Sequence, residues 1–177
     1  KEEEDLEREV KRLEDKVRED AKKLEEVVKT VEKRDHMVLH EYVNAAGITA
    51  DRVRRLTERK LDEETLRKVK EDLKRTLERL KRENEKSLEE LRDILRRLKK
   101  ENDDTLKELR DELKRLTDSG ASEDVIRKME EIIKRLEEVS REVEKRLRRI
   151  IRELERVSKE VLDRLREIIE KLDRDAT

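Results

Sequence analysis

The sequence contains no cysteine, proline, phenylalanine or tryptophan, and only two of its 177 residues are glycine. Without cysteine the chain can form neither a disulfide framework nor a thiolate metal site, which is compatible with a reducing cytosol. The scarcity of proline and glycine leaves little material for turns and loops. Because 57% of the residues are charged and the apolar 32% recur at regular spacing, the sequence predicts an all-α protein with long helices.

The sequence also has no long run of residues that carry charge of a single sign. Fifty basic residues stand against 51 acidic ones, the net charge is −1, and the two signs alternate along the chain. Because no basic stripe exists to follow phosphates, we expect no nucleic-acid partner. No apolar run approaches the roughly 20 residues of a membrane span, so we expect no membrane association. Neither a phosphate-binding glycine loop nor a nucleophile with an orienting histidine is present, so we expect no enzyme and no cofactor.

Apolar residues recur at steps of three and four from Leu6 to Val31, which places them on one side of a helix. The same stripe continues to Leu56, and Asp35 is the one stripe position with clearly the wrong polarity. We therefore expect a first helix over residues 2–58. Asp62 can cap a second helix, for which we expect residues 63–117. Gly120 suits the left-handed position after a helix and Ser122 can cap a third, for which we expect residues 123–173.

Three helices of similar length joined by short turns are expected to lie antiparallel, in an up-down-up bundle that forms one domain over residues 1–177. Several features repeat every eighteen residues, including Asn84 with Asn102 and Ser140 with Ser158. Eighteen residues are five turns of an undistorted helix, so the repeat keeps the core face straight. Folding the chain about residue 121 brings Asn102 level with Ser140 and Asn84 level with Ser158. We expect two buried polar layers; the alternative is that these residues only interrupt a leucine-rich stripe.

One segment, RDHMVLHEYVNAAGIT, departs from the surrounding pattern of Glu, Lys, Arg and Leu. It contains both histidines, the only tyrosine and one of the two glycines. Over all sixteen positions it closely resembles the eleventh β-strand of green fluorescent protein. The positions that carry the resemblance, and hence the expected binding residues, are Arg34, Asp35, His36, Met37, Val38, Leu39, His40, Glu41, Tyr42, Val43, Asn44, Ala45, Ala46, Gly47, Ile48 and Thr49.

In that family, the eleventh strand supplied as a separate peptide completes a barrel truncated to its first ten strands. The resemblance therefore implies a ten-strand fragment of green fluorescent protein as the partner. It also implies that Glu41 would face the chromophore in a completed barrel, and that this chain alone is colourless because the chromophore-forming residues lie outside this strand. His36 and His40 have a spacing that can hold a metal ion on a helix, but no third ligand is evident and we expect no resident metal site.

The helical stripe passes through the segment in register, so we expect Arg34–Thr49 to be held as helix. Gly47 and several β-branched residues disfavour helix, so its helicity must come from packing. The other 161 residues resemble de novo designed bundles, specifically latch-and-cage switches that hold a peptide inside a helix. We expect a cage that releases the strand when the first helix is displaced by another helix or a further copy. The alternative is a structural bundle or oligomer that carries an always available tag.

Overall fold

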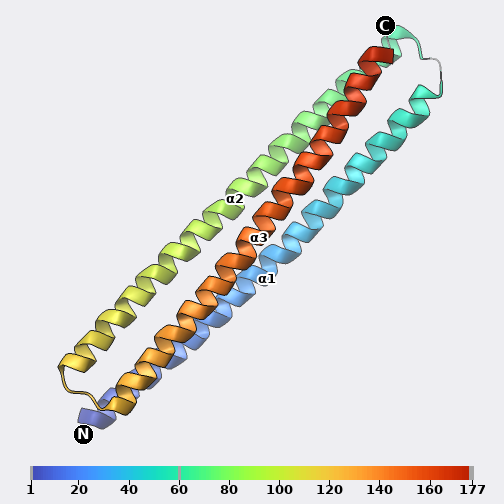
Figure 1. Cartoon of the computed structure of the whole chain (residues 1–177). Helices are drawn as coiled ribbons and strands as arrows, with labels where there is room; N and C mark the ends of the chain where they lie inside the picture. The colour runs from blue at the N-terminus through green and yellow to red at the C-terminus, as the bar shows by residue number, and fades with distance from the viewer. Residues whose placement is uncertain (1, 60, 176–177) are drawn as a thin grey trace. The chain divides into compact units, whose positions relative to one another are not determined.

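A computed structural model describes residues 2–59 and 61–175. It contains α1 (Glu2–Thr57), α2 (Glu63–Asp118) and α3 (Glu123–Asp175), and no strand among the residues described (Figure 1). The predicted all-α three-helix bundle is confirmed. The helices begin at the expected residues, and their C-terminal ends differ from the expected ones by one or two residues. Charged residues interrupt the apolar stripe of every described helix too often for any of them to span a lipid bilayer.

Local sequence explains where the helices begin and end. The Asp62 carboxylate accepts a hydrogen bond of 2.9 Å from the backbone N–H of Thr65, which caps the start of α2. Gly120 has a φ of 77°, a left-handed conformation that glycine adopts without a steric penalty. Around it, the N–H of Ala121 donates to the carbonyl of Leu116 at 3.0 Å, which is typical of a glycine-terminated helix.

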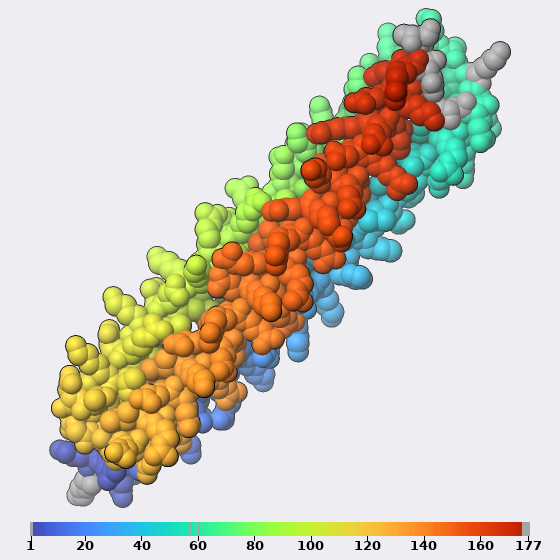
Figure 2. Space-filling view, viewed as in Figure 1, coloured from blue at the N-terminus to red at the C-terminus, as the bar shows by residue number. Residues whose placement is uncertain are grey.

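The chain packs as two compact units, each of which contains a piece of all three helices. The first unit consists of Lys1–Val31 and Asp93–Arg149, and the second unit of Glu32–Arg92 and Ile150–Thr177. The segment Arg34–Thr49 belongs to the second unit. In the space-filling view, side chains of α3 (orange to red) lie beside those of α2 (green to yellow) within each unit (Figure 2).

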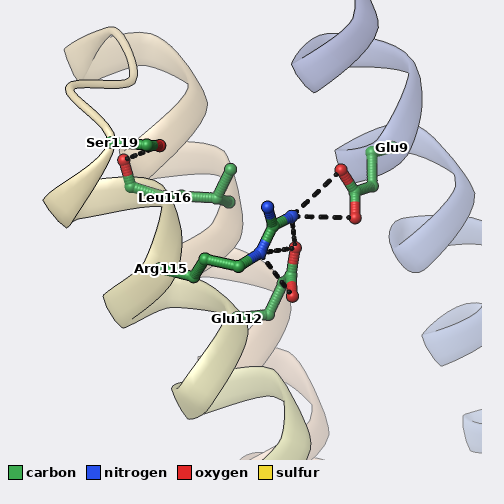
Figure 3. Close-up of polar contacts among 5 residues, drawn as sticks. All are labelled: Glu9, Glu112, Arg115, Leu116 and Ser119. Atoms are coloured by element: carbon green, nitrogen blue, oxygen red, sulfur yellow. Dashed lines mark hydrogen bonds and ion pairs between the residues drawn. The ribbon is translucent and has the colours of Figure 1, made fainter.

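Ion pairs show how the helices run within the first unit. Arg115 on α2 contacts Glu9 on α1 at 3.2 Å and also pairs with Glu112 on its own helix (Figure 3). Arg110 on α2 contacts Glu137 on α3 at 2.7 Å. Consecutive helices in this unit are therefore antiparallel. The hydrogen bond from Arg115 holds the pKa of Glu112 below its usual value.

The second unit has the same arrangement. Arg34 on α1 contacts Glu90 on α2 at 2.6 Å, and Lys70 on α2 contacts Asp173 on α3 at 2.8 Å. The hydrogen bond from Lys70 lowers the pKa of Asp173. These pairs lie at the surface, where salt bridges contribute about 0–1 kcal/mol each, so they orient the helices more than they stabilise them. Stability must come from the apolar stripes.

Large side chains are buried in both units. In the first unit the most deeply buried ones are Val10, Val28, Leu116, Met129, Leu136 and Leu147. In the second unit Leu154 is buried to the same extent, and two clusters surround the final turns of α1 and the segment of interest. The cluster beside the segment consists of Tyr42, Leu80, Val161 and Leu165. All three helices thus contribute to the core around Tyr42.

Candidate functional site

Every residue of Arg34–Thr49 is helical, within α1. The helix passes through Gly47 without a break, although glycine costs about 1 kcal/mol in a helix interior. Gly47 is exposed, and a Cβ added there would meet nothing within 4 Å. Neither a turn nor a close approach therefore requires glycine at this position in the bundle.

The segment turns one face to the core, in the predicted register. Tyr42 is 4% exposed and Asp35 is 8% exposed. The half-buried positions are Val38, Leu39, Ala45, Ala46 and Thr49. His36, His40 and Gly47 lie on the opposite side of the helix and are exposed. The helical stripe therefore accommodates the strand-like sequence, with Asp35 as the charged residue on the buried face.

The solvent face of the same segment carries unusually apolar residues. Met37 is 64% exposed, Val43 is 55% exposed and Ile48 is 65% exposed. Among the described residues, these are the large apolar side chains that are exposed. In an extended strand Met37 and Val43 would share a face with Leu39, which is half-buried in the helix. Side chains that would lie together on a strand are divided between the core and solvent by the helix.

Tyr42 anchors the segment to the other two helices. Its hydroxyl donates a 2.6 Å hydrogen bond to the carbonyl of Leu80 on α2. Its ring packs with Leu80, Val161 and Leu165. Burial raises the pKa of Tyr42, the nearby Ser158 hydroxyl partly offsets this effect, and Glu83 adds to it. The phenol is therefore neutral and acts as a donor at physiological pH.

Two of the polar residues predicted to form layers surround this tyrosine. Asn84 is 8% exposed and Ser158 is 2% exposed. Ser158 lies close enough to affect the Tyr42 hydroxyl, and Asn84 follows Leu80 by one helical turn. The layer thus includes Tyr42, which sequence reasoning did not assign to it. Its position one helical turn from the level of Asn84 in the antiparallel fold was the signal that could have identified it.

Neither layer forms the side-chain hydrogen bonds that such a layer needs. In the second unit Asn84 Oδ1 and Ser158 Oγ have no hydrogen-bond partner among the described residues. In the first unit Asn102 and Ser140 line the same small cavity of about 30 Å³, and Ser140 Oγ is buried without a partner. The fold brings Asn102 and Ser140 together as expected. Unpaired polar groups cost stability, so their benefit must lie elsewhere.

We expect Asn102→Leu to keep or raise thermal stability while it loosens helix register or association state. Leucine adds apolar burial beside the cavity, whereas the amide contributes specificity more than energy. Thermal unfolding followed by circular dichroism, together with light scattering, measures both effects. A loss of several kcal/mol with unchanged register would contradict this prediction.

Asp35 is the least favourable residue of the segment in this fold. Its side chain lies on the buried face and its Oδ1 atom has no hydrogen-bond partner in the described chain. The pKa of Asp35 is raised to about 6, mainly by burial; repulsion from Glu153 on α3 adds to the rise and His36 opposes it. The bundle therefore holds a carboxylate where its charge is destabilising.

Equivalent positions of the eighteen-residue repeat show which side chains occupy the place of Asp35 elsewhere in α1. Asp35 lies eighteen residues after Val17 and eighteen before Val53, and both valines are buried. Ala46 likewise occupies the position of Val28 in the preceding repeat. The strand-like sequence thus replaces valine by a carboxylate at one core position and by a smaller side chain at another. Both changes weaken the packing of α1 in the second unit.

Amide hydrogen exchange tests the helical state of the segment. We expect residues 36–48 to be protected together with residues 10–30, because α1 is continuous through both. Protection should be lower in 36–48, since the second unit holds that segment with the poorer core positions described above. Exchange of residues 36–48 at the rate of an unstructured peptide, with 10–30 protected, would contradict the embedded helix.

No family model matches the chain, and neither curated proteins nor solved structures yield a match. The class of protein is therefore defined by the fold alone: a three-helix bundle with Arg34–Thr49 inside its first helix. The described residues include no group of three or more His, Cys, Asp or Glu that could hold a metal ion.

Proposed function

We propose that this chain is a designed cage for the eleventh strand of a split green fluorescent protein. The bundle holds Arg34–Thr49 as helix and releases it to the ten-strand fragment when this part of α1 is displaced. The supporting observation is the exposure of Met37, Val43 and Ile48 beside a buried, unpartnered Asp35. Neither placement suits a helix in water, and both follow if the sequence serves a second conformation.

Geometry requires the segment to leave the bundle before it can function as a strand. Sixteen residues span about 24 Å as helix and about 53 Å as strand. Side chains that follow a 3.6-residue stripe in α1 would alternate between two faces in the barrel. Tyr42 would then give up its hydrogen bond to Leu80 and its place in the core. Binding therefore competes directly with packing.

Competition of this kind sets the strength of the cage. A free-energy gap of about 2.7 kcal/mol between the caged and released states already holds the released state near one per cent. The affinity of the ten-strand fragment for the intact protein is reduced in proportion to the population of the released state. A helix or a second copy of the chain that occupies the place of α1 would remove this penalty. We propose such a displacing helix as the second partner.

Mixing the intact protein with the ten-strand fragment tests this function. Fluorescence should develop more slowly and to a lower extent than with an equal concentration of the free Arg34–Thr49 peptide, and neither component should fluoresce alone. If the intact protein and the free peptide act equally fast, the segment is an always available tag on a structural bundle. Absence of fluorescence with the free peptide would contradict the proposed partner.

A further inference from the structure

His36 and His40 lie four residues apart on the continuous helix α1, and both side chains are exposed. Residues with this spacing are neighbours on one helix face, with Cβ atoms roughly 5–6 Å apart. Two neutral imidazoles in this arrangement can bind one divalent ion together, as they do in helical zinc sites.

The same two residues cannot chelate in the other conformation. In an extended strand, residues 36 and 40 share a face but lie roughly 13 Å apart. Zinc is bound by histidine nitrogen at about 2.0–2.1 Å, so one ion cannot reach both rings across that separation. The same two histidines can therefore chelate one ion when the segment is helical but not when it is extended.

We propose that His36 and His40 form a two-histidine site for a divalent transition-metal ion that exists only while the segment is helical. Water completes the coordination sphere, because the described chain offers no group of three His, Cys, Asp or Glu ligands. The ion is an external ligand of the caged state and differs from the resident metal centre that the sequence did not lead us to expect. Nickel, copper and zinc are the ions that suit imidazole ligands.

An ion that binds one conformation shifts the balance between the two. Binding reduces the released population by the factor 1 + [ion]/Kd, which is about 11 when the ion concentration is ten times the Kd. Zinc should therefore tighten the cage without contacting the core. This consequence for complementation depends on the proposed function, whereas chelation itself depends only on the helix.

The first experiment tests the site without the fluorescent partner. Zinc is added at pH 7.5, and thermal unfolding is followed by circular dichroism. The unfolding temperature should rise with zinc and return to its original value on addition of a chelator. His40→Gln should abolish the rise, since a single imidazole does not distinguish helix from unfolded chain.

A matched control keeps two histidines in the same segment but changes their spacing. The double variant His40→Gln with Glu41→His places the second ring five residues from His36, about 140° around the helix. Both altered side chains are exposed, so the core is unaffected. This variant should show no zinc-dependent rise. An equal rise in the control, or none in the original protein, would overturn the proposed site.

The second experiment separates the site from the proposed function. At zinc concentrations ten times the Kd, complementation of the ten-strand fragment by the intact protein should slow about tenfold, whereas the free peptide should be unaffected. Complementation by the respaced control, compared with the same variant without zinc, should not slow when zinc is added. If zinc raises the unfolding temperature but leaves complementation unchanged, the metal site holds and the requirement that the segment unwinds before release is wrong.

Discussion

Complementation of the ten-strand fragment is expected to accelerate at least tenfold when Leu165 is replaced by alanine. Leu165 is 3% exposed and packs against Tyr42 from α3. Buried Leu→Ala substitutions cost about 2–5 kcal/mol, and each 1.4 kcal/mol of lost caging is worth a factor of ten in the released population. The sequence that the fragment binds remains intact, because Leu165 lies outside Arg34–Thr49. The rate with the free peptide sets the upper limit.

Leu136→Ala provides the matched control for this prediction. Leu136 is 1% exposed and belongs to the first unit, so its replacement should cost a similar amount of stability. It leaves the core around Tyr42 unchanged and should accelerate complementation much less. The measurement is the initial rate of fluorescence at fixed fragment concentration, beside thermal unfolding of both variants. Equal acceleration by the two variants would show that global unfolding, and not local release, exposes the segment.

Stability is expected to fall as pH rises from about 4 to about 6, through the contribution of Asp35. Its pKa rises from 3.8 in the unfolded chain to about 6 in the fold, so the folded state binds more protons across this interval. Below pH 4 the Asp35 carboxyl is protonated in both the folded and the unfolded chain, and its contribution to stability is fully present. Above pH 6 it is lost. A shift of about two units corresponds to about 3 kcal/mol of stability at most, and solvent screening reduces this contribution.

Other carboxylates act in the opposite direction, so a variant must isolate this effect. The pKa values of Asp62, Glu112 and Asp173 are lowered, and their contributions are lost as pH falls. Chemical unfolding of the original protein and of Asp35→Asn should therefore be compared between pH 4 and 7.5. The difference between the two curves should change by about 2 kcal/mol. Parallel curves would show that Asp35 does not titrate in this interval.

Glu153→Gln supports the same test without a change in the strand sequence. Glu153 lies on α3 and raises the pKa of Asp35 by repulsion, after burial. Removal of its charge should lower the pKa of Asp35 and reduce the loss of stability at neutral pH. Glu153→Gln should raise stability at neutral pH less than Asp35→Val does. Asp35→Val removes the carboxylate and also restores the valine found at residues 17 and 53 of the repeat.

Local sequence was sufficient for the elements themselves. The caps at Asp62 and Gly120 depend on atoms a few residues apart, so their hydrogen bonds could be predicted from residue types alone. The spacing of apolar residues likewise predicted which side of Arg34–Thr49 faces the core. The resemblance of the segment to a strand depends on sequence alone, and its role in complementation remains a prediction.

The sequence by itself thus determined the helices, their ends and the buried stripe, because these follow from short-range geometry with a fixed 3.6-residue period. Tertiary structure alone decided that Tyr42 bonds to the carbonyl of Leu80, that Asp35 lies near Glu153, and that Asn84 Oδ1 and Ser158 Oγ are buried without hydrogen-bond partners among the described residues. Such contacts depend on the rotation and rise of neighbouring helices within a fraction of an ångström. A repeat of eighteen residues sets the level of a side chain, but it does not set the direction in which its polar atoms point.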